Sequence, residues 1–453
     1  MTDAAPSLAA LAADLASGAT SSRDLVEGCL ERIARSSEGA TTFLAVAAEG
    51  ARAAADAMDL LRRAGAAPSP WAGIPISIKD LFDIAGEVTT AGSVVLADRP
   101  PARRDAPAVA RLRRAGFVVI GRTNMTEFAY SGLGLNPHHG TPRSIWGRDE
   151  GRGRAPGGSS SGAAVSVAEA MAHAALGTDT GGSCRIPAAF NRLVGFKPTA
   201  RRVPREGAIP LSTTLDSIGP IARTTDCCAV LDAILAGEEP VALDLRPVAG
   251  LRLAVPTTHV LDGLDPAVAE AFGAALKRLG DAGAAITEIE APEFAEIPGL
   301  GAGGGFTAAE AYAWHEETLT ARGEAYDRRV AARLRVGATR SAVEYLRLEA
   351  ARRRLIDAVA ARFAGFDAVV MPTVAVVPPR IADLDDDEAY VRTNLQVLRN
   401  TSLINMIDGC AVSLPIGGDA PVGLMVAGTA GSDRTVLTVA RAIEQALGRP
   451  VRS

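Results

Sequence analysis

The sequence predicts an α/β protein with a large mixed central β-sheet flanked by α-helices. Short β-branched apolar runs, the Gly-rich turns between them and the Ala-rich or amphipathic stretches that alternate with the runs all indicate this class. With 453 residues, 48% of them hydrophobic, the chain can bury an extensive core. We expect one domain over residues 1–453: a helical N-terminal arm (1–70), a core that carries the chemical motifs (71–235) and a C-terminal part (236–453) that completes the sheet and the substrate pocket.

The predicted elements follow in chain order. Helices are expected over residues 6–35, and the second of them begins at a capping box formed by Ser21 and Asp24. The expected strands are 74–78, 118–120, 193–196, 251–255, 285–290, 368–371, 411–415 and 423–427. The further expected helices are an Ala-rich one near 162–176, an amphipathic one over 266–281, two long charged ones within 307–363 and a last one over 432–447.

Composition excludes several classes of function. The net charge is −5 and both signs are mixed along the chain, so we expect no nucleic-acid partner but a small molecule. There is no run of about 18 apolar residues, which argues against a membrane span. The N-terminus has no basic residue before Arg23, so a cytoplasmic protein is expected. Five cysteines without C-x-x-C spacing predict neither disulfides nor a zinc site, and we expect no metal and no cofactor.

Lysine is rare in this chain, because only Lys79, Lys197 and Lys277 among the 47 basic residues are lysines. Lys79 ends the apolar strand sequence Ile-Pro-Ile-Ser-Ile-Lys. Desolvation beside such a strand lowers the pKa of an ammonium group and makes the neutral amine available as a base. The alternatives are a lysine that extends to solvent from the strand end, or an ion pair with Asp80. We interpret Lys197 as structural and Lys277 as a surface residue.

Two Gly/Ser-rich segments follow. The segment Pro156-Gly-Gly-Ser-Ser-Ser-Gly162 precedes a helix and places amide and hydroxyl groups at its N-terminus. It also contains the G-x-S-x-G pattern of an esterase around Ser160, and a flexible linker is the simplest alternative. In Gly177-Thr-Asp-Thr-Gly-Gly-Ser183, two glycines before a serine allow successive N–H groups to face one oxyanion. An ordinary turn would have the same composition.

Taken together, these segments resemble the amidase signature family. Lys79 lies 80 residues before Ser159, and Ser159 lies 24 residues before Ser183, in the order and at the serine interval of that family. The resemblance also covers residues 121–129, 195–199 and 216–220. It implies the amidase signature fold and the hydrolysis of a linear carboxamide C–N bond.

The resemblance implies a Ser–Ser–Lys triad in which no histidine takes part. Ser183 is the expected nucleophile, Ser159 the bridging serine and Lys79 the base, so that protons pass from Ser183 through Ser159 to the neutral amine. An acyl-enzyme then forms on Ser183 and is hydrolysed by water. The peptide bond that enters Ser159 is expected to be cis. The expected oxyanion donors are the backbone N–H groups of Thr180, Gly181, Gly182 and Ser183.

Five further residues are expected around the site. Ser160 and Asp179 are expected to support the loops by hydrogen bonding, although both could equally be plain turn and cap residues. Arg185 is expected to bind a substrate carboxylate, with a structural ion pair as the alternative. Tyr130 and Ser131 are expected to form part of the pocket wall.

Other interpretations remain to be weighed. An esterase built on Ser160 needs a downstream histidine, but His173 lies within the helix predicted directly after the loop. Cys184 is expected to be a buried filler rather than the nucleophile. A non-catalytic binding protein would not need the intact triad. The strongest rival is the amidase component of a multi-protein complex, such as a tRNA-dependent amidotransferase, that is inactive without its partner. The sequence leaves open a homodimer or a complex with a small partner protein, and a small carboxylated or urea-derived amide is the closest substrate expectation.

Overall fold

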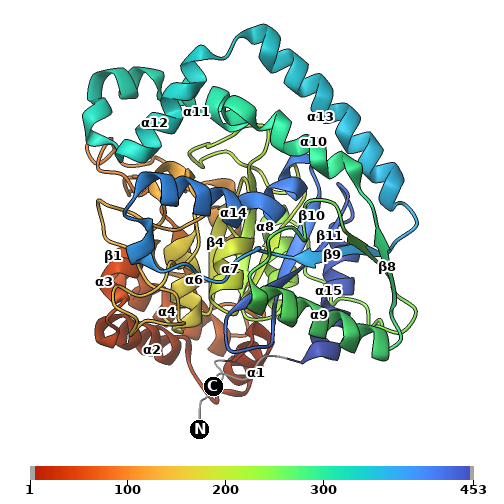
Figure 1. The fold of residues 1–453 in the computed structure, drawn as a ribbon. Coiled ribbons are helices and arrows are strands. Elements are labelled where there is room, and N and C mark those ends of the chain that lie inside the picture. The colour runs from red at the N-terminus through yellow and green to blue at the C-terminus, as the bar shows by residue number, and fades with distance from the viewer. Residues whose placement is uncertain (1–5, 449–453) are drawn as a thin grey trace.

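A computed structural model describes residues 6–448, which fold around one eleven-stranded mixed β-sheet (Figure 1). The strand order is β1-β3-β2-β4-β6-β5-β10-β11-β9-β7-β8. Parallel pairs join β2 to β3 and β4, and β7 to β8 and β9, while the other neighbours are antiparallel. The mixed α/β class predicted from the sequence is therefore confirmed. The strands are β1 (Phe43–Val46), β2 (Pro75–Lys79), β3 (Val118–Thr123), β4 (Ala174–Asp179), β5 (Val194–Lys197), β6 (Ser217–Ala222), β7 (Arg252–Pro256), β8 (Ala285–Ile289), β9 (Ala368–Pro372), β10 (Cys410–Ile416) and β11 (Val422–Gly428).

Helices cover both faces of this sheet. On one face, α6 and α7 pack on the central strands and α14 packs on α7, while α8 and α15 pack together on the other face. The α-helices are α1 (Leu8–Ser17), α2 (Ser22–Arg35), α3 (Gly39–Thr42), α4 (Ala48–Arg63), α5 (Pro107–Arg114), α6 (Ser161–Ala168), α7 (Arg185–Phe190), α8 (Thr225–Ala236), α9 (Pro266–Asp281), α10 (Pro292–Leu300), α11 (Gly305–Arg322), α12 (Arg328–Val336), α13 (Ala342–Phe363), α14 (Asp387–Met406) and α15 (Asp433–Leu447). The 3-10 helices are η1 (Glu127–Ala129), η2 (Ala302–Gly304), η3 (Gly323–Ala325), η4 (Gly337–Thr339) and η5 (Ile381–Leu384).

The N-terminal helices begin where their caps predict. The Ser21 hydroxyl accepts from the Asp24 N–H, and the Asp24 carboxylate accepts from the Ser21 N–H, which completes the predicted capping box of α2. Helix α2 packs against β2 and β3, and α4 packs against β3. Strands β1, β4 and β6 are not among the strands expected from the sequence. Strand β1 adds an antiparallel edge next to β3.

Two of the predicted helical stretches differ in the structure. The helix expected near 162–176 ends at Ala168, because Ala170 adopts a positive φ of 55° and the chain then enters β4. The two helices expected within 307–363 are three, α11 to α13. At Gly337 a Cβ atom would lie 2.0 Å from the Ala308 carbonyl oxygen, so glycine permits the close turn that separates α12 from α13.

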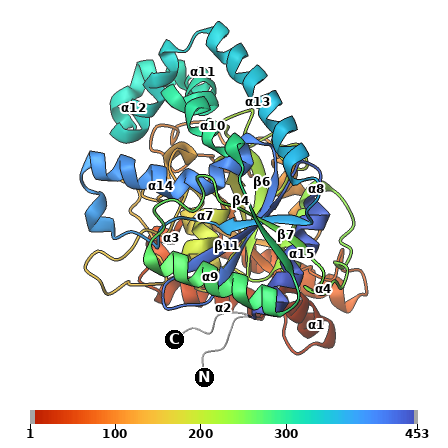
Figure 2. The same ribbon diagram turned by 45° about the vertical axis from the view of Figure 1, so that its right-hand side comes forward.

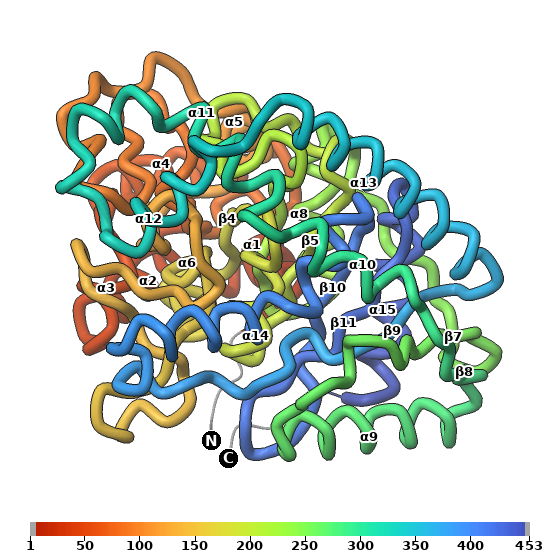
Figure 3. The backbone as a smooth tube through the Cα atoms, turned by 45° about the horizontal axis from the view of Figure 1, so that its top comes forward, coloured from red at the N-terminus to blue at the C-terminus, as the bar shows by residue number. Residues whose placement is uncertain are grey.

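The helices α10 to α13 form a projecting unit, here named the outer lobe (residues 292–363). It rises above the sheet in Figure 1 and Figure 2, and the trace in Figure 3 shows α13 running along α10. The lobe is fastened to the core beside η1. Glu127 Oε2 accepts from the Asp327 N–H at 2.8 Å, and the Phe128 ring lies 4.3 Å from the His315 ring, between centroids. The lobe thus covers the loop that follows β3.

Within residues 6–448, no helix combines the length and the apolar character that a bilayer span requires.

Candidate active site

Lys79 lies at the carboxyl end of the central strand β2 and is completely buried. Its Nζ donates to Ser159 Oγ at 2.8 Å and to Thr178 Oγ1 at 2.7 Å. The neighbouring strand residues Ile76 and Ile78 belong to the hydrophobic core. Desolvation lowers the pKa of Lys79 from 10.5 to about 8, although nearby acidic groups oppose this shift. The neutral amine is therefore well populated near pH 8.

The carboxylate that follows Lys79 in the sequence is engaged elsewhere. Asp80 accepts from Arg122 Nε at 2.6 Å and from the Gly92 N–H at 2.9 Å, and both Asp80 and Arg122 are buried. Among the residues that the structure describes, no Asp or Glu forms an ion pair with Lys79. The ion pair between Lys79 and Asp80 that the sequence left open is absent.

The backbone around Ser159 is held from two sides. The Gly158–Ser159 peptide bond is cis, as the family resemblance implies. The Ser159 carbonyl accepts from the Thr126 N–H at 3.1 Å, and the Gly158 N–H donates to the Gly132 carbonyl at 2.8 Å. Helix α6 begins two residues later, so the hydroxyl of Ser159 is presented from a fixed turn at a helix N-terminus.

Ser160 connects the loops that carry the two serines. Its N–H donates to the Ser183 carbonyl at 3.3 Å, and its hydroxyl donates to the Thr178 carbonyl at 3.3 Å. Ser183 itself is buried, in the turn that follows β4. In the described part of the chain, no hydrogen bond joins the hydroxyls of Ser159 and Ser183. The structure brings Lys79 and Ser159 into direct contact and holds Ser183 next to them through the main chain.

The four amides expected to face an oxyanion are not equivalent. Within residues 6–448, the N–H groups of Thr180, Gly181 and Ser183 have no hydrogen-bond partner. The Gly182 N–H differs, because it donates to Asp179 Oδ1 at 2.8 Å. Its amide is therefore occupied inside the turn, and only the other three are free to bind a substrate.

Glycine is required at position 182 for a steric reason as well. Its φ is 134°, and a Cβ atom there would lie 2.3 Å from Thr401 Oγ1 and 2.5 Å from Ile186 Cδ1. This close approach lets α14 hold the turn, since Thr401 Oγ1 donates to the Gly181 carbonyl at 2.6 Å.

Asp179 and Arg185 form a fully buried ion pair under the turn. Arg185 Nε donates to Oδ2 at 3.0 Å and Nη2 donates to Oδ1 at 2.9 Å, while Nη2 also donates to Asn405 Oδ1 at 2.7 Å. Desolvation would raise the pKa of Asp179, but the guanidinium outweighs it and holds that pKa well below its ordinary value. These surroundings match the structural ion pair that was the alternative for Arg185, with Asp179 supporting the turn.

Cys184 directly follows Ser183 in the chain. It is completely buried, and its Sγ contacts the Gly219 carbonyl at 3.6 Å. Burial raises the pKa of this thiol far above its ordinary value, so the thiolate is not populated at neutral pH. These surroundings fit a buried filler.

The residues expected in the pocket wall lie where the outer lobe meets the core. Ser131 Oγ donates to Asn394 Oδ1 at 2.8 Å and accepts from the Tyr390 hydroxyl at 2.8 Å. Arg333 of α12 donates to the Tyr130 carbonyl, and its guanidinium carbon lies 5.8 Å and 5.4 Å from the ring centroids of Tyr130 and Tyr390. The two wall residues are therefore held by α12 and α14.

This wall adjoins the turns that carry the serines. Leu398 of α14 would lie 3.1 Å from a Cβ atom on Gly132 and 3.4 Å from one on Gly181. Gly132 follows the wall residues directly, and its carbonyl accepts from Gly158 N–H at 2.8 Å. Tyr130, which accepts from Arg333, therefore lies two residues before Gly132, whose carbonyl binds the Ser159 loop.

The histidines are arranged differently from those of a Ser-His-Asp enzyme. No histidine in residues 6–448 forms a hydrogen bond with Ser159, Ser160 or Ser183. Desolvation lowers the pKa of His173 to about 4. His138 Nε2 is instead hydrogen-bonded to Glu127 Oε1 at 2.8 Å. Across the described residues there is also no group of three or more His, Cys, Asp or Glu side chains placed to hold a metal ion.

Three residues that contact the expected site residues were not singled out in the sequence. Thr178 and Asp216 lie inside segments that resemble the family, so the motif position could have marked them. Thr178 is the second acceptor of Lys79, and Asp216 Oδ1 accepts from Thr180 Oγ1 at 2.5 Å. Arg333 lies in a charged helix with the pattern of a solvated surface, and only the tertiary structure places it against Tyr130.

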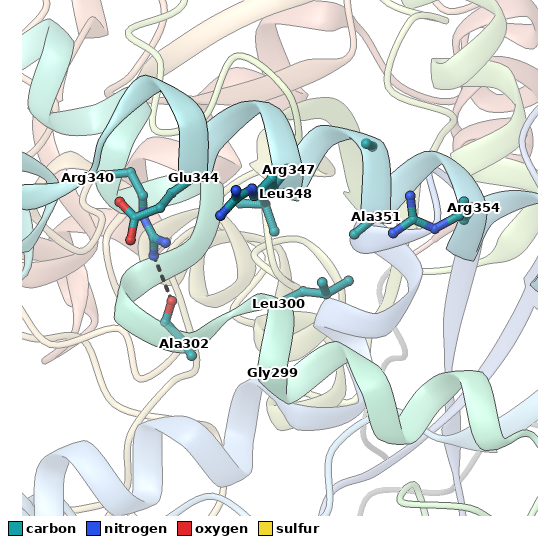
Figure 4. Close-up of a pocket in the computed structure, with 10 residues that line it drawn as sticks. Gly299, Leu300, Ala302, Arg340, Glu344, Arg347, Leu348, Ala351 and Arg354 are labelled. Carbon is teal, nitrogen blue, oxygen red and sulfur yellow. Dashed lines mark hydrogen bonds between the residues drawn. The ribbon is translucent and has the colours of Figure 1, made fainter.

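A separate groove of about 500 Å³ lies on the outer lobe between α13 and the end of α10 (Figure 4). Leu300, Arg347 and Arg354 line it, and Arg340 closes one end by donating to the Ala302 carbonyl at 2.7 Å. None of the predicted site residues lines this groove. It is therefore distinct from the candidate active site.

Comparison with known proteins agrees with the fold and the motifs. A sequence model of the amidase family matches residues 24–437. The 2-amino-5-chloromuconic acid deaminase of Comamonas testosteroni is 38% identical over 432 residues, which cover 94% of this chain and 92% of the deaminase. One of the subunits of the glutamyl-tRNA(Gln) amidotransferase of Chromohalobacter salexigens is 34% identical over 478 residues, covering 97% of this chain and 96% of that protein. A crystal structure of an amidase superposes with a TM-score of 0.88 at 32% identity, covering 98% of this chain and 100% of the other.

The family match spans most of the chain, and the similar structure covers nearly all of it. The segments that resemble the amidase signature family in the sequence lie together at the centre of this shared fold. The chain belongs to the amidase family and is a hydrolase of amide carbon–nitrogen bonds.

Proposed function

We propose that this chain hydrolyses a linear carboxamide through an acyl-enzyme on Ser183, with Ser159 and Lys79 as the proton relay. The observation that carries the proposal is the 2.8 Å hydrogen bond between Lys79 Nζ and Ser159 Oγ in a fully buried setting. A lysine whose pKa is lowered to about 8, and which has no carboxylate partner among the described residues, can act as a neutral base.

The relay balances its protons over the two half-reactions. Ser183 Oγ attacks the carbonyl carbon while its proton passes to Ser159 and the Ser159 proton passes to Lys79, which becomes an ammonium group. When the tetrahedral intermediate collapses, the C–N bond breaks and the proton returns through Ser159 to the leaving nitrogen. Water then attacks the ester by the same route and releases the acid. Catalytic hydrogen bonds often tighten only in the substrate complex, so we expect the contact between Ser159 and Ser183 to form there.

The developing oxyanion is bound by main-chain donors in this proposal. Of the four expected donors, the amides of Thr180, Gly181 and Ser183 have no hydrogen-bond partner among the described residues. One donor of this kind contributes about 10²- to 10³-fold to the rate in a serine hydrolase. The Gly182 amide serves a different purpose, because its bond to Asp179 fixes the direction of the turn.

The substrate we propose is a small amide that also carries a carboxylate. Arg333 supports this class, since no Asp or Glu in residues 6–448 forms an ion pair with it. Its guanidinium faces two aromatic rings of the wall, Tyr130 and Tyr390, and keeps donors for a bidentate carboxylate. The deaminase that is 38% identical to this chain is named for an acid, 2-amino-5-chloromuconic acid, which agrees with such a substrate.

A second candidate function is that of the amidase component of a multi-protein complex, inactive without its partner. The 34% identical protein of Chromohalobacter salexigens is named for its place in an amidotransferase, and the similarity covers nearly the whole chain. The two candidates differ in one measurable property. A free-standing amidase hydrolyses small amides when purified alone, whereas the partner-dependent component gains activity only in a complex.

The test is ammonia release by the purified chain from a matched pair of amides. Butyramide and succinamic acid have nearly the same length, and only the second carries a carboxylate. We expect turnover by the chain alone, with the higher kcat/KM for succinamic acid. Inactivity toward a broad panel of linear amides would contradict the free-standing amidase.

The variant Arg333→Gln separates carboxylate recognition from the chemistry. It should lower kcat/KM for succinamic acid by about 10-fold or more and leave butyramide unchanged, because a lost charge-assisted bond costs about 1.5–3 kcal/mol. Arg335→Gln, an exposed arginine on the same helix, is the matched control. An equal loss on both amides would instead assign Arg333 to the fold.

A further inference from the structure

We propose that Asp216 is a positioning residue for this reaction: its carboxylate holds the Thr180 hydroxyl and thereby fixes the turn that carries the oxyanion donors. The inference rests on the proposed function, because it concerns the same acyl-transfer site. It adds a residue to which neither the motif resemblance nor the comparisons assign a role.

The sheet places these two residues opposite each other. Strands β4 and β6 are antiparallel, and their last paired residues are Asp179 and Ser217. Thr180 is therefore the first residue beyond the ladder on one strand, and Asp216 is its counterpart on the other. Thr180 Oγ1 donates to Asp216 Oδ1 at 2.5 Å, directly where the oxyanion turn begins. The Ser217 hydroxyl closes the end of the ladder by donating to the Asp179 carbonyl at 2.9 Å.

The second carboxylate oxygen of Asp216 is fixed by its own loop. Oδ2 accepts from the N–H groups of Leu211 at 3.0 Å and Ser212 at 3.1 Å. Desolvation raises the pKa of Asp216 to about 6, and the hydrogen bonds from Thr180 and the two amides oppose that shift. The group is therefore mostly ionised at neutral pH. An asparagine at this position cannot accept from all three donors. Its NH2 group would replace one of the two carboxylate oxygens and would face either the Thr180 hydroxyl or the two backbone amides.

The outer lobe holds this loop from outside. Glu310 of α11 accepts from the Ser212 hydroxyl and from the Thr214 N–H at 3.1 Å. Its other oxygen accepts from the Tyr345 hydroxyl at 2.6 Å. Asp216 therefore lies between a loop anchored to α11 and the turn that it holds through Thr180.

The oxyanion turn is thus restrained from two directions. Thr401 of α14 binds the Gly181 carbonyl at 2.6 Å, and Asp216 binds the Thr180 side chain. Removal of the second contact leaves Thr180 free to rotate its peptide plane, and a donor that turns away no longer stabilises the transition state. The negative charge of Asp216 also favours the ammonium form of Lys79. The hydrogen bond and the charge can be removed separately.

The experiment compares four variants on the full chain, with turnover normalised to fluorophosphonate-titrated sites. Thr180→Val removes the hydrogen bond and keeps the charge, and we expect kcat to fall about 10-fold or more with KM little changed. Thr180→Ser keeps the hydroxyl and should restore kcat. Asp216→Asn removes the charge as well, so its acid limb of kcat/KM should also move to lower pH. The control Thr199→Val breaks a similar buried bond that involves neither Thr180 nor Asp216, from Thr199 Oγ1 to Asp433 Oδ2 at 2.7 Å, and should lower Tm without lowering kcat.

The outcomes separate this inference from the proposed function. A Thr180→Val enzyme with kcat within twofold of the parent, or a Thr199→Val enzyme with the same loss of kcat, overturns the positioning role. If Asp216→Asn fails to fold, the Thr180→Val and Thr180→Ser pair decides alone. A parent chain that hydrolyses amides but is not labelled at Ser183 overturns the proposed mechanism instead, whatever the Thr180 variants do.

Discussion

Thr178 Oγ1 accepts a hydrogen bond from Lys79 Nζ at 2.7 Å. The parallel pairing of β2 and β4 sets this contact, because it places the carboxyl ends of both strands side by side. A neutral amine has two N–H groups and one lone pair. With one N–H directed to Thr178, the lone pair can face the Ser159 hydroxyl at 2.8 Å, which is the orientation that proton transfer requires.

The three lysines of the chain make a matched set of variants. Lys79→Met should lower kcat by about 10²- to 10⁴-fold, the usual contribution of a general base. Its Tm should stay level or rise, because a desolvated ammonium is costly to bury. Lys277→Met, on an exposed side chain paired with Asp281, should change neither quantity. Near-normal turnover in Lys79→Met would remove the base from the mechanism.

Lys197 should behave as a structural lysine. Its buried Nζ donates to the carbonyls of Pro198 at 2.8 Å and Gly409 at 2.6 Å, so Lys197→Met leaves two acceptors unpaired at a cost of about 1–3 kcal/mol each. The pKa of Lys197 is lowered from 10.5 to about 8, mainly by desolvation and to a smaller extent by the charge of Arg185. The unfolded chain then binds more protons between pH 8 and 10.5, so this group adds stability as pH rises through that window. Urea titrations at both ends of this window measure the free energy of unfolding. The difference between the parent and Lys197→Met should be larger at pH 10.5 than at pH 8.

The pH profile of turnover should have an acid limb set by Lys79. Only the neutral amine accepts a proton, and the pKa is lowered to about 8 by desolvation. We therefore expect kcat/KM to rise with pH and to level off above about pH 8. Initial rates across pH 6 to 10 on one amide check this. A profile that is flat below pH 8 would show that the base is some other group.

A fluorophosphonate should label Ser183. Labelling followed by peptide mass analysis should fail in Ser183→Ala and persist in Cys184→Ala, because the buried thiol has a raised pKa and no thiolate to offer. We expect Cys184→Ala to keep kcat within a few-fold. Loss of labelling in that variant would point to the cysteine as the nucleophile.

Removal of Arg185 should destabilise the fold. Arg185→Gln leaves the buried Asp179 without its counter-ion, which typically costs about 3–5 kcal/mol. Arg152→Gln breaks an exposed ion pair with Asp385 and should cost about 0–1 kcal/mol. Urea unfolding measures both. If Arg185→Gln kept its stability and only raised KM for carboxylated amides, the arginine would belong to the substrate pocket.

Much of the fold follows from local pattern. The apolar run that ends in Lys79 forms β2, and the capping box at Ser21 starts α2, because both depend on neighbours a few residues away. The end of helix α6 at Ala168 is harder to predict, because the Ala-rich sequence continues beyond that residue. There the pairing of β4 with β2 and β6 overrides helix propensity.

The amidase family, the mixed α/β class and the three side chains proposed for the relay can be predicted from the sequence, because fixed spacing within short motifs marks them. The ion pair of Arg185 with Asp179, the hydrogen bond that occupies the Gly182 amide and the contact of Arg333 with Tyr130 become visible only in the folded chain. Short-range motifs record what the main chain does locally. Contacts between residues far apart in the chain depend on strand order and on how the outer lobe docks, and no local pattern encodes either.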